Sequence, residues 1–208
     1  MKIICVGHNY NAHNKEMNRE ALSSASDPVL FMKPDSAILH NDKNQFFIPD
    51  FSENIHYELE VVIKIDKMGK NIAERFAHRY YNEITVGIDF TARDLQDKLK
   101  AKGLPWEISK GFDNSAALGT FVPKDKFGKA MDDLGFTLLK NGEQVQIGNT
   151  KDMIHSIDKI VAYASQFFTL KTGDLIFTGT PAGVGRVDIG DTLIGKLEGE
   201  DLLNVSIC

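Results

Sequence analysis

The chain has 208 residues, of which 42% are hydrophobic and 25% are charged, as is ordinary for a globular protein with one sizeable core. Its formal net charge of −5 argues against a general nucleic-acid-binding protein, which would be basic. No apolar run approaches the roughly 18 residues of a membrane-spanning helix, so no membrane partner is expected.

The first residues predict a β-strand and a cytoplasmic location. The apolar run in residues 1–7 is too short for a signal peptide. Cys5 and Cys208 are therefore expected to be free thiols. No repeat, low-complexity tract or long linker interrupts the chain, so residues 1–208 are expected to form a single domain.

Short elements follow one another along the chain. Asn9 is expected to cap a helix, and Thr91 to cap a second helix that Gly103 ends. Helices are predicted over residues 9–22 and 92–102, separated by a loop at 23–28 and by strands over 29–32, 46–48, 57–65 and 84–90.

The second half of the chain gives stronger local signals. Asn141-Gly142 predicts a hairpin between strands at 136–140 and 143–147. Ser156 is expected to cap a helix whose apolar stripe, from Ile157 to Phe168, packs on a sheet. Further strands are predicted at 175–178, 192–198 and 202–207. Many short strands and few helices predict a mainly β, α+β fold, a mixed roll or sandwich with peripheral helices.

Two glutamates lead into the predicted strand over 57–65. Alternate residues of a strand share a face, so Glu58 and Glu60 project together. Adjacent carboxylates repel each other and are costly to bury, and Mg²⁺ or Mn²⁺ would relieve this cost because hard cations prefer carboxylate oxygens. A solvated strand face is the alternative. His56 shares this face, and an outer role supporting the ligands is favoured for it over a role as fourth ligand.

Asp89 ends another strand, at a strand-to-helix corner, and would supply a third oxygen ligand. Three carboxylates and one divalent cation leave a charge of about −1, which Lys110 could neutralise. The alternatives are a helix-capping role for Asp89 and a surface position for Lys110.

Two side-chain pairs have helical spacing. His13 and Glu16 lie three residues apart, and a carboxylate beside a histidine raises its basicity, as in a general base. Arg93 and Gln96 have the same spacing, and Arg93 could hold a substrate carboxylate in a bidentate manner. Solvent-facing pairs are the alternative for both.

A glycine-rich stretch runs from Thr178 to Gly185. It lacks the Gly-Lys-Ser/Thr sequence of a phosphate-binding loop, so nucleotide binding is not expected. A tight loop that brings backbone amides and the Thr180 hydroxyl near a ligand is favoured instead.

Taken together, these motifs resemble the fumarylacetoacetate hydrolase family, in its small single-domain branch of acylpyruvate hydrolases and oxaloacetate decarboxylases. The resemblance covers nearly the whole chain. It rests on residues 6–10, 13–17, 28–34, 56–60, 89–97, 102–106 and 178–185. Two positions depart from the family pattern: His8 stands where related enzymes often carry arginine, and Gly111 where a serine is common.

The resemblance implies a mixed β-roll, a homodimer, and Mg²⁺ or Mn²⁺ held by Glu58, Glu60 and Asp89. It assigns catalytic roles to Lys110 and to a water-activating dyad on a mobile lid over residues 13–26. The dyad residues are His13 and Glu16, and the implied substrate contacts are Arg93, Gln96 and Thr180.

The implied function is metal-dependent C–C hydrolysis of acylpyruvates such as acetylpyruvate or fumarylpyruvate, with possible decarboxylation of oxaloacetate. A 2,4-dioxo acid would chelate the metal through its carboxylate and 2-oxo group. Two alternatives stay open: an isomerase or decarboxylase acting on 2-hydroxyhepta-2,4-diene-1,7-dioate in aromatic-acid catabolism, and a non-enzymatic metal-dependent binding protein.

Overall fold

The computed structural model of the chain describes residues 1–18, 20–40 and 44–208. Residue 19, within the predicted lid, and residues 41–43 lie outside the described part. The described strands are β1 (Ile3–Gly7), β2 (Val29–Lys33), β3 (Gln45–Phe46), β4 (Ile55–Tyr57), β5 (Leu59–Ile65), β6 (Tyr81–Asp89), β7 (Thr91–Ala92), β8 (Ala116–Leu118), β9 (Val122–Pro123), β10 (Gly135–Lys140), β11 (Glu143–Asn149), β12 (Leu175–Phe177), β13 (Gly185–Arg186), β14 (Thr192–Leu197) and β15 (Glu200–Ile207). The described helices are α1 (Asn11–Glu16), α2 (Glu74–Ala77), α3 (Arg93–Ala101), α4 (Glu107–Lys110) and α5 (Ile157–Phe167), with 3₁₀ turns η1 (Asp35–Ala37) and η2 (Thr150–Asp152).

The strands form three sheets. A seven-stranded sheet has the order β2-β1-β12-β5-β6-β8, with β9 also paired to β6. A five-stranded sheet has the order β11-β10-β14-β15-β3, and β13, β4 and β7 form a small third sheet. Strands β1 and β12 run parallel, as do β15 and β3, whereas the remaining pairs are antiparallel. The predicted mainly β fold with mixed sheets is therefore confirmed.

The two large sheets pack face to face over the main core. Gly195 on β14 lies against the large sheet, where an added Cβ would come within 3.1 Å of the side chains of Leu59 and Val86. The absence of a side chain at this position allows the sheets to approach closely. The carboxylate-bearing strand β5 is thereby fixed between its sheet neighbours and the opposite sheet.

The large sheet uses its two faces differently. Along β5, Val61 and Ile63 belong to the main core, whereas Val62 belongs to a smaller cluster on the other face. Because side chains alternate along a strand, Glu60 projects toward the face of Val62. Asp89 on β6 lies on this face too, since Ile88 points into the main core. The alternation thus keeps the carboxylates out of the main core.

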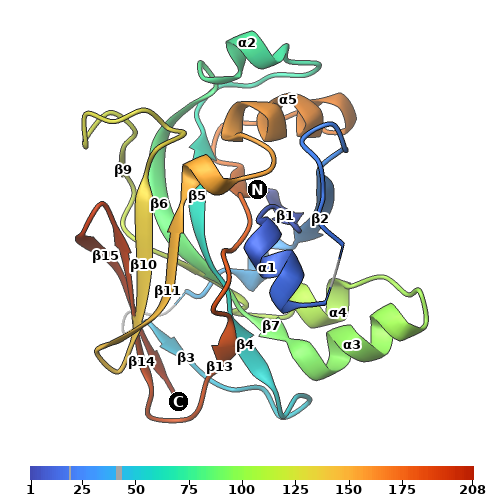
Figure 1. The fold of residues 1–208 in the computed structure, drawn as a ribbon, viewed down its shortest axis with the longest axis vertical. Coiled ribbons are helices and arrows are strands. Elements are labelled where there is room, and N and C mark those ends of the chain that lie inside the picture. The colour runs from blue at the N-terminus through green and yellow to red at the C-terminus, as the bar shows by residue number, and fades with distance from the viewer. Residues whose placement is uncertain (19, 41–43) are drawn as a thin grey trace.

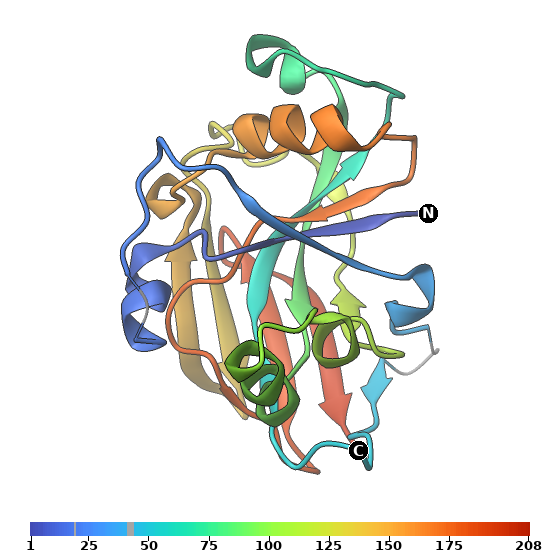
Figure 2. The same cartoon turned by 90° about the vertical axis from the view of Figure 1, so that its right-hand side faces the viewer.

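The helices lie at two ends of the molecule. Helices α2 and α5 lie across one end of the sheets, and α3 and α4 lie at the opposite end (Figures 1 and 2). Helix α1 lies near β1, beside the β10–β11 hairpin in Figure 2. No helix among the described residues is long and apolar enough to cross a membrane.

Several local predictions are confirmed. The hairpin turn at Asn141 and Gly142 has positive φ at both residues, as its sequence requires. The side chain of Ser156 caps α5 by accepting a hydrogen bond from the Lys159 amide. The closing pair of strands is joined through Gly199, and both cysteines are free thiols.

Other predictions are corrected. The first helix covers only Asn11–Glu16, and the Asn11 side chain bonds the main chain of Leu22, so the chain turns back instead of continuing. Asn9 does not cap this helix, because its amide bonds His155 and Thr178 instead. Thr91 does not cap α3, whose N-cap is Ala92.

Two strand boundaries and the burial of one residue also differ. The strand predicted over 57–65 is interrupted at Glu58, where β4 leaves the large sheet to pair with β7 and β13. The strand predicted over 46–48 is limited to Gln45–Phe46. Phe167 is 57% exposed, although the apolar stripe of α5 predicted its burial.

Candidate metal and substrate site

Three buried carboxylates meet beside the large sheet. The strands β5 and β6 run antiparallel, and their pairing ends with the Asp89 amide donating to the Glu58 carbonyl at 2.9 Å. This register brings Asp89 next to Glu58 and Glu60 although Asp89 follows Glu60 by 29 positions in the sequence. One oxygen from each side chain lies within 4.8 Å of the others, and the three residues are at most 5% exposed. The solvated-face alternative for Glu58 and Glu60 is therefore wrong.

Lys110 bridges two of these carboxylates. Its Nζ donates to Glu58 Oε2 and Asp89 Oδ2, both at 2.7 Å, and to the Thr91 hydroxyl at 2.6 Å. The residue lies at the end of α4 and is 3% exposed, so it is not a surface lysine. Its position agrees with the predicted charge-balancing role.

Lys33, which we did not predict as a site residue, occupies the other side of Asp89. Its fully buried Nζ lies 2.7 Å from Asp89 Oδ1 and donates to the Ser115 hydroxyl at 2.9 Å. It also donates to the main-chain carbonyl of Lys110. Its sequence signals were its position at the end of an apolar strand, which is common for surface lysines, and its place in the segment 28–34 that carries the family resemblance.

Arg93 supplies a third positive charge. It was predicted to hold a substrate carboxylate with Gln96, but its Nη2 pairs with Glu58 Oε1 and its Nη1 donates to Gln96 Oε1 at 2.6 Å. The three carboxylates are therefore matched by Lys33, Lys110 and Arg93. The formal charges of these six side chains add up to zero. The sequence had suggested that Lys110 alone balances the carboxylates, whereas the structure uses three cationic side chains.

These neighbours act differently on the two glutamates. Burial alone would raise the pKa of Glu58, but Lys110 and Arg93 outweigh it and hold that pKa well below its usual range. Burial, together with the charges of Asp89 and Glu58, raises the pKa of Glu60 well above its usual range. Burial opposes the charge of Lys110, yet Asp89 and Glu58 raise the pKa of its ammonium group. Among the three carboxylates of the described site, Glu60 is thus the one whose charge is not stabilised by a paired cationic side chain, and a bound cation would stabilise it most.

The donor set fits a hard divalent cation. A small cavity of about 20 Å³ adjoins the carboxylates, which is room for roughly one water-sized particle. Metal–oxygen distances of about 2.0–2.6 Å allow one ion to reach oxygens some 4–5 Å apart. The all-oxygen set of Glu58, Glu60 and Asp89 suits Mg²⁺ or Mn²⁺ better than a soft metal.

The predicted dyad reaches the same cavity. His13 on α1 is 4% exposed and lines the cavity, and its Nδ1 lies 3.0 Å from Glu16 Oε2. The other oxygen of Glu16 accepts a hydrogen bond from the Gly183 amide at 2.9 Å. The pair is therefore held by the glycine-rich loop, with His13 buried at the cavity and Glu16 on its solvent-exposed side.

The glycine-rich loop contacts the site through its backbone. The Gly179 amide donates to Glu60 Oε2 at 2.6 Å, and Thr180 lines the cavity. Gly179 has φ 101°, and an added Cβ would lie 2.7 Å from the Asn9 Cβ, so no other residue fits without a shift. The expectation that a loop amide approaches the site agrees with the Gly179 contact, and Thr180 borders the cavity as its proposed role requires.

His56 lies apart from the three carboxylates. It is absent from the cavity lining, and its Nε2 bonds the Asn54 side chain at 3.0 Å. Burial, followed by the nearby charge of Arg93, lowers the pKa of His56 to about 4. This placement fits an outer position better than a role as fourth ligand.

The two positions that depart from the family pattern also adjoin the site. His8 lines the cavity, adopts φ 64° and stacks on Trp106 with ring centroids 6.0 Å apart. An added Cβ at Gly111 would lie 3.1 Å from both the Glu107 carbonyl and Pro34, so a serine would require local adjustment. This local packing accounts for glycine beside Lys110.

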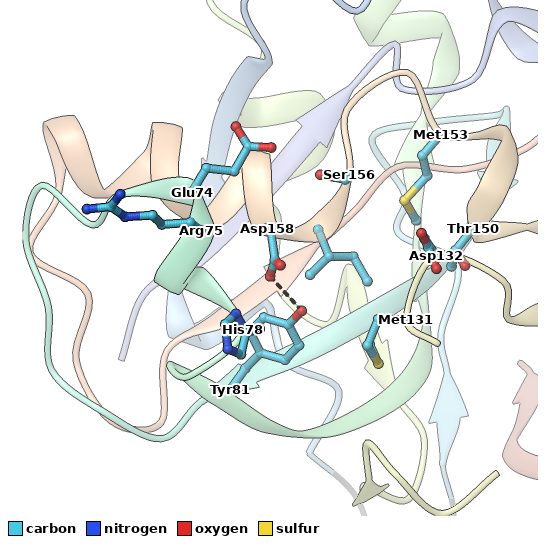
Figure 3. A pocket seen from close by; sticks show the side chains of 11 residues that line it. Glu74, Arg75, His78, Tyr81, Met131, Asp132, Thr150, Met153, Ser156 and Asp158 are labelled. Carbon is cyan, nitrogen blue, oxygen red and sulfur yellow. Dashed lines mark hydrogen bonds between the residues drawn. The ribbon is translucent and has the colours of Figure 1, made fainter. Parts of the chain in front are cut away.

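A larger pocket lies elsewhere. It has a volume of about 670 Å³ and lies between α2, the segment around Met131 and the start of α5 (Figure 3). Tyr81 donates a hydrogen bond to Asp158 at 2.9 Å there, and burial, followed by the charge of Asp158, raises the pKa of Tyr81. This pocket shares no lining residue with the carboxylate cavity, so pocket size alone does not locate the candidate site.

The mixed β fold and the buried carboxylate set define a class of proteins equipped to hold a divalent cation beside a histidine–glutamate pair. The family profile "fumarylacetoacetate (FAA) hydrolase C-terminal" matches residues 2–206. The chain belongs to this family, and the resemblance found in the sequence is confirmed.

Two curated relatives illustrate the branch. Oxaloacetate tautomerase YcgM of Escherichia coli is 40% identical over 201 residues, covering 97% of this chain and 90% of the relative. The mitochondrial oxaloacetate decarboxylase of Dictyostelium discoideum is 40% identical over 200 residues, covering 96% and 90%.

Solved structures of the same family have the same fold as this chain. The fumarylpyruvate hydrolase of Pseudomonas aeruginosa, in complex with Mn²⁺ and pyruvate, is 36% identical with a TM-score of 0.91, covering 100% of this chain and 89% of that one. The 2-hydroxyhepta-2,4-diene-1,7-dioate isomerase of Mycobacterium marinum is 33% identical with a TM-score of 0.82, covering 99% and 73%. The family is thus an enzyme family with tautomerase, decarboxylase, hydrolase and isomerase members.

Proposed function

We propose that this chain is a divalent-metal-dependent enzyme acting on 2-oxo dicarboxylic acids. The reactions proposed are tautomerisation or decarboxylation of oxaloacetate and C–C hydrolysis of acylpyruvates such as fumarylpyruvate. The observation that carries the proposal is the buried set of Glu58, Glu60 and Asp89, which faces the same small cavity as His13.

The charge of the site supports a dianionic substrate. Glu58, Glu60 and Asp89 are matched by three cationic side chains, so a bound divalent ion would leave a net charge of about +2. Oxaloacetate and fumarylpyruvate carry two carboxylates and would neutralise this charge, whereas acetylpyruvate carries one. Because a buried uncompensated charge is costly, the dicarboxylic acids should be preferred.

The dyad can move a proton. The carboxylate of Glu16 beside His13 Nδ1 favours the tautomer that carries its proton on Nδ1 and its lone pair on Nε2. In hydrolysis, His13 would take a proton from the water that attacks the distal carbonyl, and in tautomerisation it would take the proton from the carbon next to the 2-oxo group. In either reaction the imidazole is the base, and Glu16 stabilises its charged form.

The remaining residues would bind and orient the substrate. Lys110 could turn from the carboxylates to the anionic substrate, and Arg93 and Gln96 border the same cavity. The cation, when bound, would supply Lewis-acid stabilisation of the negative charge that develops on the 2-oxo group. The assignment of Glu58, Glu60 and Asp89 as its ligands is part of the proposal.

The test is a substrate panel on metal-stripped protein reloaded with Mg²⁺ or Mn²⁺. We expect turnover of oxaloacetate or fumarylpyruvate only after reloading, and at least tenfold lower kcat/KM for acetylpyruvate. Turnover of 2-hydroxyhepta-2,4-diene-1,7-dioate alone would favour the isomerase alternative. No turnover of any of the four would favour a binding protein.

Lys110→Met should tighten metal binding while destabilising the metal-free protein. Removing a unit charge a few ångströms from a divalent ion is worth several kcal/mol even at an effective dielectric of about 20, so we expect Mn²⁺ affinity to rise by at least about tenfold. Without metal, Glu58 and Asp89 lose their shared cation, at a cost of about 3–5 kcal/mol. Calorimetric titration with Mn²⁺ and thermal unfolding in chelator measure the two effects.

The control is Lys98→Met, which makes the same substitution at an exposed position of α3. It should change neither quantity. Unchanged or weaker Mn²⁺ binding by Lys110→Met would contradict the placement of Lys110 beside the cation. The homodimer, the lid over residues 13–26 and the cytoplasmic location stay predictions.

A further inference from the structure

Gln146 is a buried amide in an otherwise half-exposed hairpin strand. It is 1% exposed, whereas its neighbour Ile147 on β11 is 66% exposed. The glycine-rich loop packs closely against this part of β11, since an added Cβ at Gly183 would lie 2.3 Å from the Val145 carbonyl. Gln146 therefore points inward, between the hairpin and the candidate site.

The orientation of the Gln146 amide is fixed by its partners. The Leu59 backbone N–H, which can only donate, bonds Gln146 Oε1 at 2.9 Å. The Pro181 carbonyl, which can only accept, bonds Nε2 at 3.1 Å. Both contacts require the same assignment of oxygen and nitrogen, so Nε2 is a donor toward the loop.

This assignment determines what the Thr180 hydroxyl can do. Gln146 Nε2 donates to Thr180 Oγ1 at 2.9 Å, so the hydroxyl oxygen serves as an acceptor on that side. A hydroxyl has one hydrogen to donate, and it must then point elsewhere. Thr180 lines the cavity with His13 and Arg93, and within the described part of the chain its hydroxyl donates no hydrogen bond.

We propose that Gln146 is a positioning residue that directs the Thr180 hydroxyl hydrogen into the cavity, where it donates to an anionic oxygen of the bound oxo acid. The same amide holds Leu59, which lies between Glu58 and Glu60, so one side chain links the carboxylate segment to the substrate-binding loop. The inference rests on the proposed function, because it assumes that this cavity of about 20 Å³ widens to admit an anionic oxo acid.

The experiment is a double-mutant cycle read out by ligand binding. Gln146→Glu has nearly the same shape but replaces the donating NH₂ by an acceptor, so the Thr180 hydrogen turns toward position 146. Thr180→Val removes the hydroxyl. The probes are Mn²⁺ alone and then pyruvate added to Mn²⁺-saturated protein, at pH 8 to favour the ionised form of the introduced carboxyl.

We expect Gln146→Glu to weaken pyruvate binding by at least tenfold without weakening Mn²⁺ binding. In the Thr180→Val background the same substitution should have an effect about tenfold smaller, a coupling of about 1.4 kcal/mol. An effect of the added charge alone acts in both backgrounds and cancels in the cycle. Equal losses in the two backgrounds would overturn the inference.

A second variant guards against misfolding. Gln146→Met removes the donor without adding a charge, so it should weaken pyruvate binding less than Gln146→Glu, and only when the Thr180 hydroxyl is present. A loss that persists in Thr180→Val would overturn the inference. Failure of the wild-type protein to bind Mn²⁺, or pyruvate once loaded, would instead overturn the proposed function.

Discussion

Glu60→Gln is expected to abolish turnover and to lower Mn²⁺ affinity by about 100-fold or more, while the metal-free protein stays at least as stable as the wild type. A change in the outer shell of a metal site typically costs 10–100-fold, and a lost ligand should cost more. Among the described residues, the side chain of Glu60 accepts one hydrogen bond, which the backbone amide of Gly179 donates. A glutamine oxygen can accept this bond equally well.

Stability should not suffer, because burial and the nearby Asp89 and Glu58 disfavour the charged form of Glu60 and raise its pKa. A neutral amide removes that cost. Mn²⁺ should raise the unfolding temperature of the wild type, since a ligand that binds only the folded state stabilises it, and the same Mn²⁺ concentration should raise that of Glu60→Gln much less.

The matched control is Glu58→Gln, which removes a carboxylate with different partners. Glu58 is paired with Lys110 and Arg93, so this substitution leaves the buried Arg93 without a carboxylate partner and Lys110 with Asp89 alone, and should cost about 3–5 kcal/mol in the metal-free protein. Calorimetry and thermal unfolding with and without Mn²⁺ distinguish the two variants. Wild-type Mn²⁺ affinity in Glu60→Gln would show that Glu60 is not a ligand.

His13→Ala should separate the reactions that need a general base from the one that does not. Fumarylpyruvate hydrolysis and oxaloacetate tautomerisation each require a base, so both should fall by about 10²-fold or more. Oxaloacetate decarboxylation loses CO₂ without an activated water and should fall much less. Steady-state rates of the three reactions on the Mn²⁺-loaded enzyme measure this difference.

A substitution of the other dyad residue, Glu16, should have a smaller effect on the rate than His13→Ala. Glu16→Gln keeps a group that can bond Gly183 and the imidazole but removes the charge that stabilises protonated His13, so a loss of about tenfold is expected in hydrolysis. Mn²⁺ affinity should stay unchanged in both variants. Equal losses in hydrolysis and decarboxylation would assign His13 to binding or closure and not to proton transfer.

The sequence by itself determined the features that depend on neighbours along the chain. Alternation along a strand placed Glu58 and Glu60 on one face, and helical spacing paired His13 with Glu16. The turn at Asn141 and the cap at Ser156 followed from local backbone preferences. These signals involve residues a few positions apart, so their physics is fully present in the local sequence.

Only the tertiary structure decided which charges and amides complete the site. Lys33 and Arg93 became partners of the carboxylates because folding brings the end of β2 and the start of α3 to the site, and no local pattern encodes that meeting. Gln146 reaches Leu59 across 87 positions of sequence. The desolvation of these groups makes such pairing obligatory, since a buried charge or amide without a partner would cost several kcal/mol, but the choice of partner depends on the fold.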